Sequence, residues 1–188
     1  SSEWFYQGEL KSAPEVKYRR ILDYDTPIEW INTEGMECNE EFVGESFGRI
    51  NKEEAALSIS QLTNYINKIG KDRFLEERID VGLISPYKAQ VQYLRQLIKR
   101  DAFFKPYRHL ITINTVDGFQ GQERDVILIS LVRANEEGQI GFLNDLRRMN
   151  VAITRARMKL IILGDASTLT KHPFYKKLYE YIYSLQTH

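Results

Sequence analysis

The chain has 188 residues, of which 43% are hydrophobic and 28% charged, and its 26 basic and 26 acidic side chains balance to a formal net charge of zero. This composition indicates a folded chain long enough to bury a core, and it excludes disordered, collagen-like and coiled-coil proteins. The single cysteine, Cys38, excludes an internal disulfide and a thiolate metal cluster, which favours a cytoplasmic setting. We expect neither export nor a membrane span, because the first residues lack the order of a signal peptide and no apolar run approaches about 18 residues.

The charges are unevenly distributed along the chain. Residues 1–80 carry 17 acidic and 10 basic side chains, for a net charge of −7, whereas residues 81–188 carry nine acidic and 16 basic ones, for a net charge of +7. The asymmetry predicts that a phosphate-bearing ligand binds the second half of the chain, although a solvated acidic face on the first half would account for it equally well.

Residues 1–50 are predicted to form an irregular N-terminal extension that packs on a core of residues 51–188, the two parts making a single domain. Within the extension, the segment from Pro27 to Ile31 alternates like a strand. Asn51 is a possible N-cap, and the residues after it carry apolar side chains at helical spacing until Gly70. This pattern predicts a helix.

The second half contains short apolar runs that predict buried strands. Because these runs do not alternate with polar residues, both faces of their sheet should be covered, and the helix expected over Ala89–Lys99 favours parallel connections. A closing helix is expected from Pro173. The predicted fold is α/β, a three-layer sandwich around a mainly parallel sheet, with ligand-binding residues just after the strands. The predicted strands are Val81–Ile84, Leu110–Ile113, Val126–Val132 and Leu160–Leu163.

The first motif, Ser-Pro-Tyr-Lys-Ala-Gln from Ser85 to Gln90, directly follows a predicted strand. A helix that begins here presents backbone N–H groups and a partial positive charge to an anion, Lys88 adds a cation, and Tyr87 can stack on a base. The plainer explanation is that Ser85 caps the helix and Tyr87 covers the edge of the sheet.

The second motif is the polar segment of residues 114–125 between two predicted strands. Gly118 and Gly121 permit close approach of a ligand, the amides near Thr115 can hold a phosphate, and Glu123 can accept from ribose hydroxyls or metal-bound water. Turn formation alone would account for the glycines, but it requires neither the Glu123 carboxylate nor Gln120.

The third motif is the basic segment of residues 147–157. Arg148, Ala152 and Arg155 are spaced so that a helix through this segment would carry two guanidiniums on one face, past a small residue. Guanidiniums fit phosphate oxygens and keep their charge, as in the arginine fingers of phosphoryl-transfer enzymes. The alternative is an exposed basic helix face.

Several chemistries find no support in the sequence. A phosphate-binding loop of the form G-x-x-x-x-G-K-[ST] does not occur, because the single Gly-Lys pair, Gly70-Lys71, continues into Asp72. Asp165 follows a predicted strand but has no acidic neighbour for magnesium and is interpreted as a helix cap. The three histidines lack the spacing of a metal site, so no metal-ligating residue is assigned, and the carboxylate–lysine cluster of a metal-dependent nuclease is not found.

Four segments, taken in order, resemble the superfamily-one helicases, and in particular the group of the nonsense-mediated-decay RNA helicase. The resemblance covers roughly residues 3–183 and is to the second of two RecA-like motor domains, which has no phosphate loop of its own. The family's Walker A and Walker B elements and its Gln-Tyr-Arg-Met-His-Pro segment belong further upstream, so we expect this chain to be an excised C-terminal motor domain. The four segments are Ile84–Gln90, Thr115–Glu123, Gly141–Asp145 and Asn150–Arg157, and Asn51–Ala55 further resembles the family's Asn-Arg-x-Glu-Ala helix start, with Lys52 in place of the arginine.

The resemblance implies that Arg155 is the catalytic arginine finger, which reaches the γ-phosphate of ATP. ATP and its Mg²⁺ would be held mainly by the first motor domain. The implied ATP contacts are Gln120, Gly121, Glu123 and Arg155, and the implied contacts to single-stranded nucleic acid are Ser85, Pro86, Tyr87, Gln90, Thr115, Val116 and Asn144.

The expected function is that of the second motor domain of an ATP-dependent DNA or RNA helicase. Such a domain completes the ATP site on closure, grips a single strand and, by the resemblance, supports 5′-to-3′ movement and unwinding. The expected partners are single-stranded DNA or RNA and the N-terminal RecA-like domain of the same parent chain; the fragment itself should be monomeric and inactive. The alternative is a catalytically inert nucleic-acid-binding or protein-docking module with the same fold.

Overall fold

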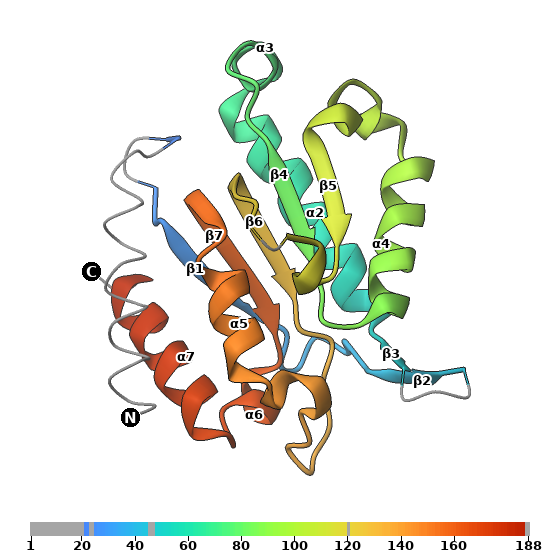
Figure 1. Ribbon diagram of the computed structural model, residues 1–188, viewed down its shortest axis with the longest axis vertical. Helices are drawn as coiled ribbons and strands as arrows, with labels where there is room; N and C mark the ends of the chain where they lie inside the picture. Colours follow the sequence, from blue (N-terminus) through green and yellow to red (C-terminus); the bar gives the residue numbers. More distant parts are fainter. Residues whose placement is uncertain (1–20, 23–24, 45–47, 120, 187–188) are drawn as a thin grey trace.

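A five-stranded parallel sheet forms the centre of the computed structural model, which describes residues 21–22, 25–44, 48–119 and 121–186 (Figure 1). The strands lie in the order β1-β7-β6-β4-β5, and every neighbouring pair is parallel. All four strands predicted from the apolar runs are present, and Val81–Ile84 has the expected ends. The strands of the sheet are β1 (Ile28–Asn32), β4 (Val81–Ile84), β5 (Ile111–Asn114), β6 (Arg124–Ser130) and β7 (Ala156–Gly164).

Helices cover both faces of the sheet, which confirms the three-layer α/β sandwich. Successive residues of a strand point to opposite faces, so Val126 and Leu128 of β6 belong to one core cluster and Ile127 and Ile129 to the other. The first cluster packs under α2 (Lys52–Ile69), α3 (Lys71–Glu76), α4 (Lys88–Arg100) and the 3₁₀ helix η1 (Ala102–Leu110). The second packs under α5 (Leu146–Ile153), α6 (Ala166–Leu169) and α7 (Pro173–Gln186).

The segment before residue 51 contributes to the core more than the sequence predicted. β1 pairs with β7 from Ile28 opposite Leu160 to Asn32 opposite Gly164, so it is an edge strand of the main sheet and not part of an irregular extension. Ile28 and Trp30 are buried on the face that α7 covers, which accounts for its position. Two further strands, β2 (Glu41–Val43) and β3 (Gly48–Ile50), form an antiparallel hairpin beside the start of α4.

Side-chain caps fix several helix ends. Asn51 caps α2 as predicted, since its Oδ1 accepts from the backbone N–H of Glu54 at 3.1 Å, and the Oδ1 of Asp165 accepts from the N–H of Thr168 at 3.2 Å. Among the described residues, no helix combines the length and the apolar character that a bilayer crossing requires.

The prediction of a helix through residues 147–157 is wrong beyond Ile153. α5 stops there, with the Thr154 hydroxyl bonded back to the carbonyls of Asn150 and Val151, both at 3.0 Å. β7 then begins at Ala156, because the apolar run that follows pairs with β1 and β6 in the middle of the sheet. Arg155 therefore lies in the turn between α5 and β7, and it does not share a helix face with Arg148.

Candidate functional site

The connections of the sheet diverge between β4 and β6. β4 leads through α4 to β5 on one side, whereas β6, its neighbour, leads through α5 to β7 on the other side (Figure 1). In open parallel sheets this divergence leaves a crevice at the carboxyl ends of the strands, where ligands bind. The segments that leave these two ends are Ser85–Tyr87 and residues 131–134.

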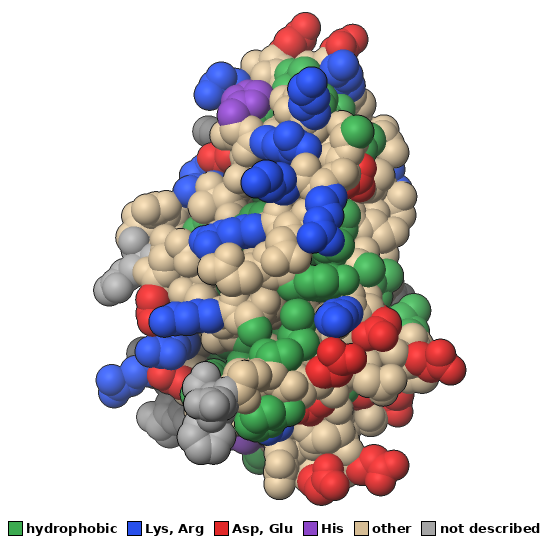
Figure 2. Space-filling model, turned by 90° about the vertical axis from the view of Figure 1, so that its right-hand side faces the viewer, with side chains coloured by type: hydrophobic (Ala, Val, Ile, Leu, Met, Phe, Trp, Pro, Cys, Tyr) green, Lys and Arg blue, Asp and Glu red, His purple; other side chains and the backbone are tan. Residues whose placement is uncertain are grey.

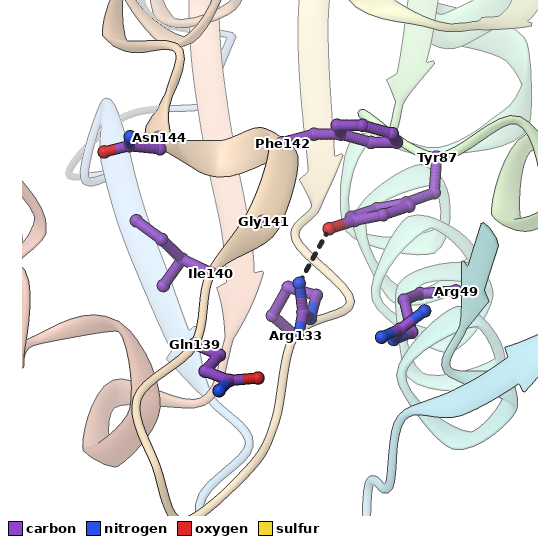
Figure 3. A pocket seen from close by; sticks show the side chains of 8 residues that line it. All are labelled: Arg49, Tyr87, Arg133, Gln139, Ile140, Gly141, Phe142 and Asn144. Atoms are coloured by element: carbon purple, nitrogen blue, oxygen red, sulfur yellow. Dashed lines mark hydrogen bonds between the residues drawn. The ribbon is translucent and has the colours of Figure 1, made fainter. Parts of the chain in front are cut away.

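Two grooves occupy this edge of the sheet. The first, termed the arginine groove, has a volume of about 580 Å³ and is lined by Arg49, Tyr87, Arg133, Gln139, Ile140, Gly141, Phe142 and Asn144 (Figure 3). The second, termed the Lys88 groove, has a volume of about 540 Å³ and includes Pro86, Lys88, Thr115, Asp117 and Arg148 in its lining. Tyr87 and Phe142 line both grooves and therefore form the wall between them.

The aromatic pair has one covered and one open ring. Tyr87 is only 2% exposed, whereas Phe142 is 51% exposed, and the ring centroids are 5.1 Å apart with an interplanar angle of 32°. In Figure 3 the Phe142 ring lies over the Tyr87 ring. The stacking surface that the sequence assigned to Tyr87 thus belongs to Phe142, which covers it.

The arginine groove carries an excess of positive charge. Arg133 is 5% exposed and Arg49 lies nearby on β3, and the Nε atoms of both donate to the same Oε2 of Glu40, at 3.0 and 3.1 Å. One carboxylate therefore serves two guanidiniums. Burial opposes the charge of Arg133, but its bonds to Tyr87 and Glu40 outweigh burial and raise the pKa of the guanidinium, so it stays charged.

Gly141 allows this groove to form. Its φ is +52°, and a Cβ atom at this position would lie 2.3 Å from a terminal nitrogen of Arg133 and 2.8 Å from the Tyr87 hydroxyl. That nitrogen donates to the same hydroxyl at 3.2 Å. Any larger residue here would push the Arg133 guanidinium and the Tyr87 hydroxyl apart, which gives a physical reason for the glycine in the Gly141–Asp145 motif.

A buried polar network supports the groove from behind. Glu54 is fully buried, and its Oε1 accepts from the Ser130 hydroxyl at 2.5 Å and from the backbone N–H of Val132 at 2.7 Å. Val132 has a φ of +72°, which is strained for a β-branched residue. The bond from its N–H to Glu54 helps to hold this conformation at the carboxyl end of β6, one residue before Arg133.

Gln90 belongs to the same network. Its side chain is fully buried, with Nε2 donating to the Asn51 carbonyl at 2.9 Å and to the Ser130 hydroxyl at 3.0 Å, while Oε1 accepts from the Asn51 N–H at 3.0 Å. The amide is fully used inside the protein, so this structure does not place Gln90 on the nucleic-acid surface that the sequence assigned to it. Its side chain instead fixes the start of α4 relative to the start of α2 and the end of β6.

The other predicted nucleic-acid contacts gather at this edge with different accessibility. Asn144 is exposed and lines the arginine groove, whereas Pro86 and Thr115 line the Lys88 groove. Ser85 is buried and its hydroxyl accepts from the Tyr87 N–H at 3.4 Å; it is not the N-cap of α4, which is Tyr87 itself. Val116 is also buried, so its contribution to a ligand is limited to its backbone.

The predicted ATP contacts lie at the opposite edge of the sheet. Gly121 and Glu123 precede β6 and Arg155 precedes β7, and the Arg124 N–H donates to the Arg155 carbonyl at 3.0 Å, which brings these segments together. Gly121 has a φ of +74°, with open space beside its Cα, and Glu123 is exposed. Gln120 lies outside the described residues. A seven-residue strand separates this edge from the grooves by roughly 20 Å.

Arg155 is folded back onto the helix that precedes it. Its Nε donates to the Val151 carbonyl at 3.1 Å, a terminal nitrogen lies 3.5 Å from the Thr154 hydroxyl, and the side chain is half-buried. Among the described residues no carboxylate forms an ion pair with Arg155. The guanidinium is thus held by neutral acceptors, so no carboxylate competes with an anion that approaches this edge.

Three groove residues have no assigned role in the sequence analysis. Arg133 follows β6, one of the places where ligand contacts were expected, so the strand pattern contained a signal for it. Phe142 lies within a quoted motif, but its exposure depends on how Tyr87 packs beneath it. No local feature of the sequence indicates a role for Arg49. It reaches the groove because it lies on the β2–β3 hairpin and pairs with Glu40, which also pairs with Arg133.

Comparison with known proteins identifies relatives over nearly the whole chain. A model of the family described as "AAA domain" matches residues 1–167. The probable helicase MAGATAMA 3 of Arabidopsis thaliana is 36% identical over 95% of this chain, and an uncharacterized ATP-dependent helicase of Methanocaldococcus jannaschii is 35% identical over 98%. The Regulator of nonsense transcripts 1 homolog of Drosophila melanogaster is 36% identical over 94%. The chain spans 22%, 27% and 15% of the lengths of these relatives, respectively.

Proposed function

The chain belongs to the superfamily-one helicases, within the AAA domain family, and we propose that it works as the second motor domain of a longer ATP-dependent enzyme that moves along single-stranded DNA or RNA. Its N-terminal RecA-like domain would be supplied by the same parent chain. By the family resemblance we also propose 5′-to-3′ movement.

The arginine groove is the observation that supports this proposal most directly. It combines an exposed aromatic ring, two guanidiniums that share one carboxylate, and the side-chain amides of Gln139 and Asn144. Proteins that grip single strands without reading sequence use these elements, with cations for the phosphates and ring faces for the bases. We propose that one base stacks on Phe142 while the adjacent phosphate lies near Arg49 or Arg133.

At the other edge the chain's own residues would complete an ATP site. Open space beside Gly121 allows a ligand to approach the backbone, Glu123 can accept from sugar hydroxyls, and Arg155 can extend from Val151 toward a phosphate. ATP is the substrate here, and magnesium would neutralise its phosphates. The described residues contain no group of three His, Cys, Asp or Glu side chains that could hold a metal ion, so no step through magnesium is assigned to this chain.

α5 connects the two edges. It begins after Asn144, in the lining of the arginine groove, and ends one residue before the Thr154–Arg155 turn. A rigid helix transmits a displacement at one end to the other, so movement of Arg155 on domain closure would shift the groove lining. We propose that this helix couples ATP binding to the grip on the strand.

The function is tested by ATP turnover of the full-length protein with and without matched single-stranded DNA and RNA. We expect turnover to rise with at least one polymer, because only a bound strand positions both motor domains for closure. The 188-residue chain serves as the control and should be inactive. A full-length protein without ATPase activity under any polymer would contradict the proposal and favour the inert binding module.

Replacing Phe142 with alanine should weaken binding to single strands about 5- to 150-fold, because stacking of one base contributes roughly 1–3 kcal/mol. Fluorescence anisotropy with labelled homopolymers measures this loss. The Phe142→Trp variant should keep the affinity, since it retains a ring face. Tyr183→Ala, which removes an exposed ring of α7, is the matched control. Equal affinity of the Phe142→Ala and wild-type proteins would rule out stacking on this ring.

A further inference from the structure

The flank formed by α4 and η1 is strongly basic. Residues 88–108 contain six Lys or Arg side chains and one acidic residue, Asp101, and Asp101 caps η1 by accepting from the Phe103 N–H at 3.0 Å. The space-filling view of this side shows blue side chains gathered over its upper half (Figure 2). The positive charge of the second half of the chain is therefore concentrated on one flank. Its six basic residues, termed the α4 track, are Lys88, Arg95, Lys99, Arg100, Lys105 and Arg108.

The α4 track runs along the helix from one edge of the sheet toward the other. Lys88, Arg95 and Lys99 are spaced by seven and four residues, so they lie in one row on the exposed face of α4. With a rise of 1.5 Å per residue, this row is about 16 Å long. Lys88 at its start lines the Lys88 groove, which shares the Tyr87–Phe142 wall with the arginine groove, so the row begins beside the proposed strand-binding surface.

Two arginines of the track are anchored but not neutralised. Arg95 donates through Nε and a terminal nitrogen to the Ile113 carbonyl, at 3.1 and 2.7 Å, and a terminal nitrogen of Arg108 donates to the Lys99 carbonyl at 2.7 Å. These bonds fix Arg95 against the edge strand β5 and Arg108 against the last turn of α4. Within the described part of the chain, no carboxylate forms an ion pair with any residue of the track.

Uncompensated like charges in one row favour a polyanion. The cations of such a row repel one another, and neutralisation by a phosphate backbone relieves this repulsion and releases counterions. The row on α4 contains no aromatic side chain, which distinguishes it from the groove with Phe142. It is suited to contact phosphates and not bases.

We propose that the α4 track binds the phosphate backbone of the nucleic-acid segment that continues past the grooves, and so lengthens the footprint of the domain. This inference rests on the proposed function, because it extends the same strand-binding surface. Its consequence is that affinity should increase with the length of the nucleic acid beyond what the grooves alone can hold.

The test is a triple variant of the full-length protein, Lys99→Gln, Arg100→Gln and Lys105→Gln. These side chains are exposed, and the replacements leave the Arg95 and Arg108 anchors in place. A second triple variant, Lys68→Gln, Lys71→Gln and Lys176→Gln, removes the same charge from exposed positions elsewhere and is the matched control. Binding is measured by anisotropy with single-stranded oligomers of increasing length at several salt concentrations.

We expect the track variant to bind the shortest oligomers like wild type but to lose the gain in affinity with length. The slope of log K against log salt for the longest oligomer should fall by roughly 2, at about 0.7 per lost phosphate contact, whereas the control keeps it. Equal affinities and salt slopes of the two triple variants at every oligomer length would overturn the proposal that the α4 track binds the phosphate backbone. A wild-type protein that binds no oligomer would instead overturn the proposed function.

Discussion

Replacing Arg155 with alanine in the full-length protein should lower ATP turnover by about 10³-fold or more. The proposed role of this guanidinium is to stabilise the charge that develops on the transferred phosphoryl group when the two motor domains close. Alanine removes that charge, and no other residue of the α5–β7 turn can replace it, because Thr154 is neutral and its hydroxyl is bonded to the last turn of α5. Steady-state ATP hydrolysis with saturating single strand measures the loss.

The geometry of Arg155 separates this effect from a loss of stability. Among the described residues, the hydrogen bonds of its guanidinium go to the Val151 carbonyl in α5 and to the neighbouring Thr154 hydroxyl, so the variant should unfold at nearly the same temperature as wild type. Binding of single strands without nucleotide should also be retained, since the arginine groove lies at the other edge of the sheet.

Arg147→Ala is the matched control, because Arg147 is an exposed arginine of the same segment. It should hydrolyse ATP at the wild-type rate. An Arg155→Lys variant should recover little activity, because an ammonium group cannot contact two phosphate oxygens in the way that a guanidinium does. Near wild-type turnover of Arg155→Ala would exclude the arginine-finger role.

The free energy of unfolding of the wild-type protein should fall by about 3 kcal/mol in total as the pH rises from 4.5 to about 7. Replacing Glu54 with glutamine should remove this decline. Burial raises the pKa of the Glu54 carboxyl from 4.5 to about 7, although the bonds from Ser130 and Val132 oppose the shift. No described residue forms a hydrogen bond with its buried Oε2, which adds to the cost of ionisation. The carboxyl is therefore neutral in the folded protein over a range of pH in which it ionises in the unfolded chain.

The sign of the effect follows from proton binding. Between pH 4.5 and about 7 the folded protein keeps a proton that the unfolded chain has released, so the free energy of unfolding falls as pH rises. The loss is complete above pH 7, and its size of about 3 kcal/mol follows from 1.36 kcal/mol for each pH unit. Glutamine cannot ionise but can still accept from the Ser130 hydroxyl and the Val132 N–H.

Urea unfolding at pH 5 and pH 8 measures the effect. The variant should be somewhat less stable than wild type at pH 5, because the amide N–H₂ group then occupies the position of Oε2, and should gain relative to wild type at pH 8. Glu53→Gln, which alters an exposed carboxylate one residue earlier, should leave the pH dependence unchanged. Parallel curves for wild type and Glu54→Gln would show that this carboxyl does not titrate near pH 7.

Much of the fold was predictable because its signals are local. The apolar runs of β4, β6 and β7 lie where strands form, and Asn51 and Gly70 mark the ends of α2 in the structure as in the sequence. The lack of polar alternation in these runs reflects a sheet that is covered on both faces, which is why it predicted the three layers. β1 was placed in an irregular extension because only its pairing with β7, more than 130 residues away, makes it part of the sheet.

The candidate site was predictable only in part. The motifs named the segments that form its surfaces, because glycine, arginine and polar residues after strands are themselves local features. The sequence did not show that Gln90 is used up in the interior, nor that Phe142 covers Tyr87, because both depend on side chains from distant elements.

The sequence by itself determined four of the five strands of the main sheet, the layers and the family, and it named the segments that contain the proposed contacts. Only the tertiary structure placed the proposed ATP contacts and the nucleic-acid grooves at opposite edges of the sheet, with α5 between them. It also built the arginine groove, in which Arg49 and Arg133 share Glu40 across as many as 93 residues of chain. The physical reason is that hydrophobic periodicity specifies which face of an element is buried, whereas the pairing of individual polar groups depends on how all the elements pack together.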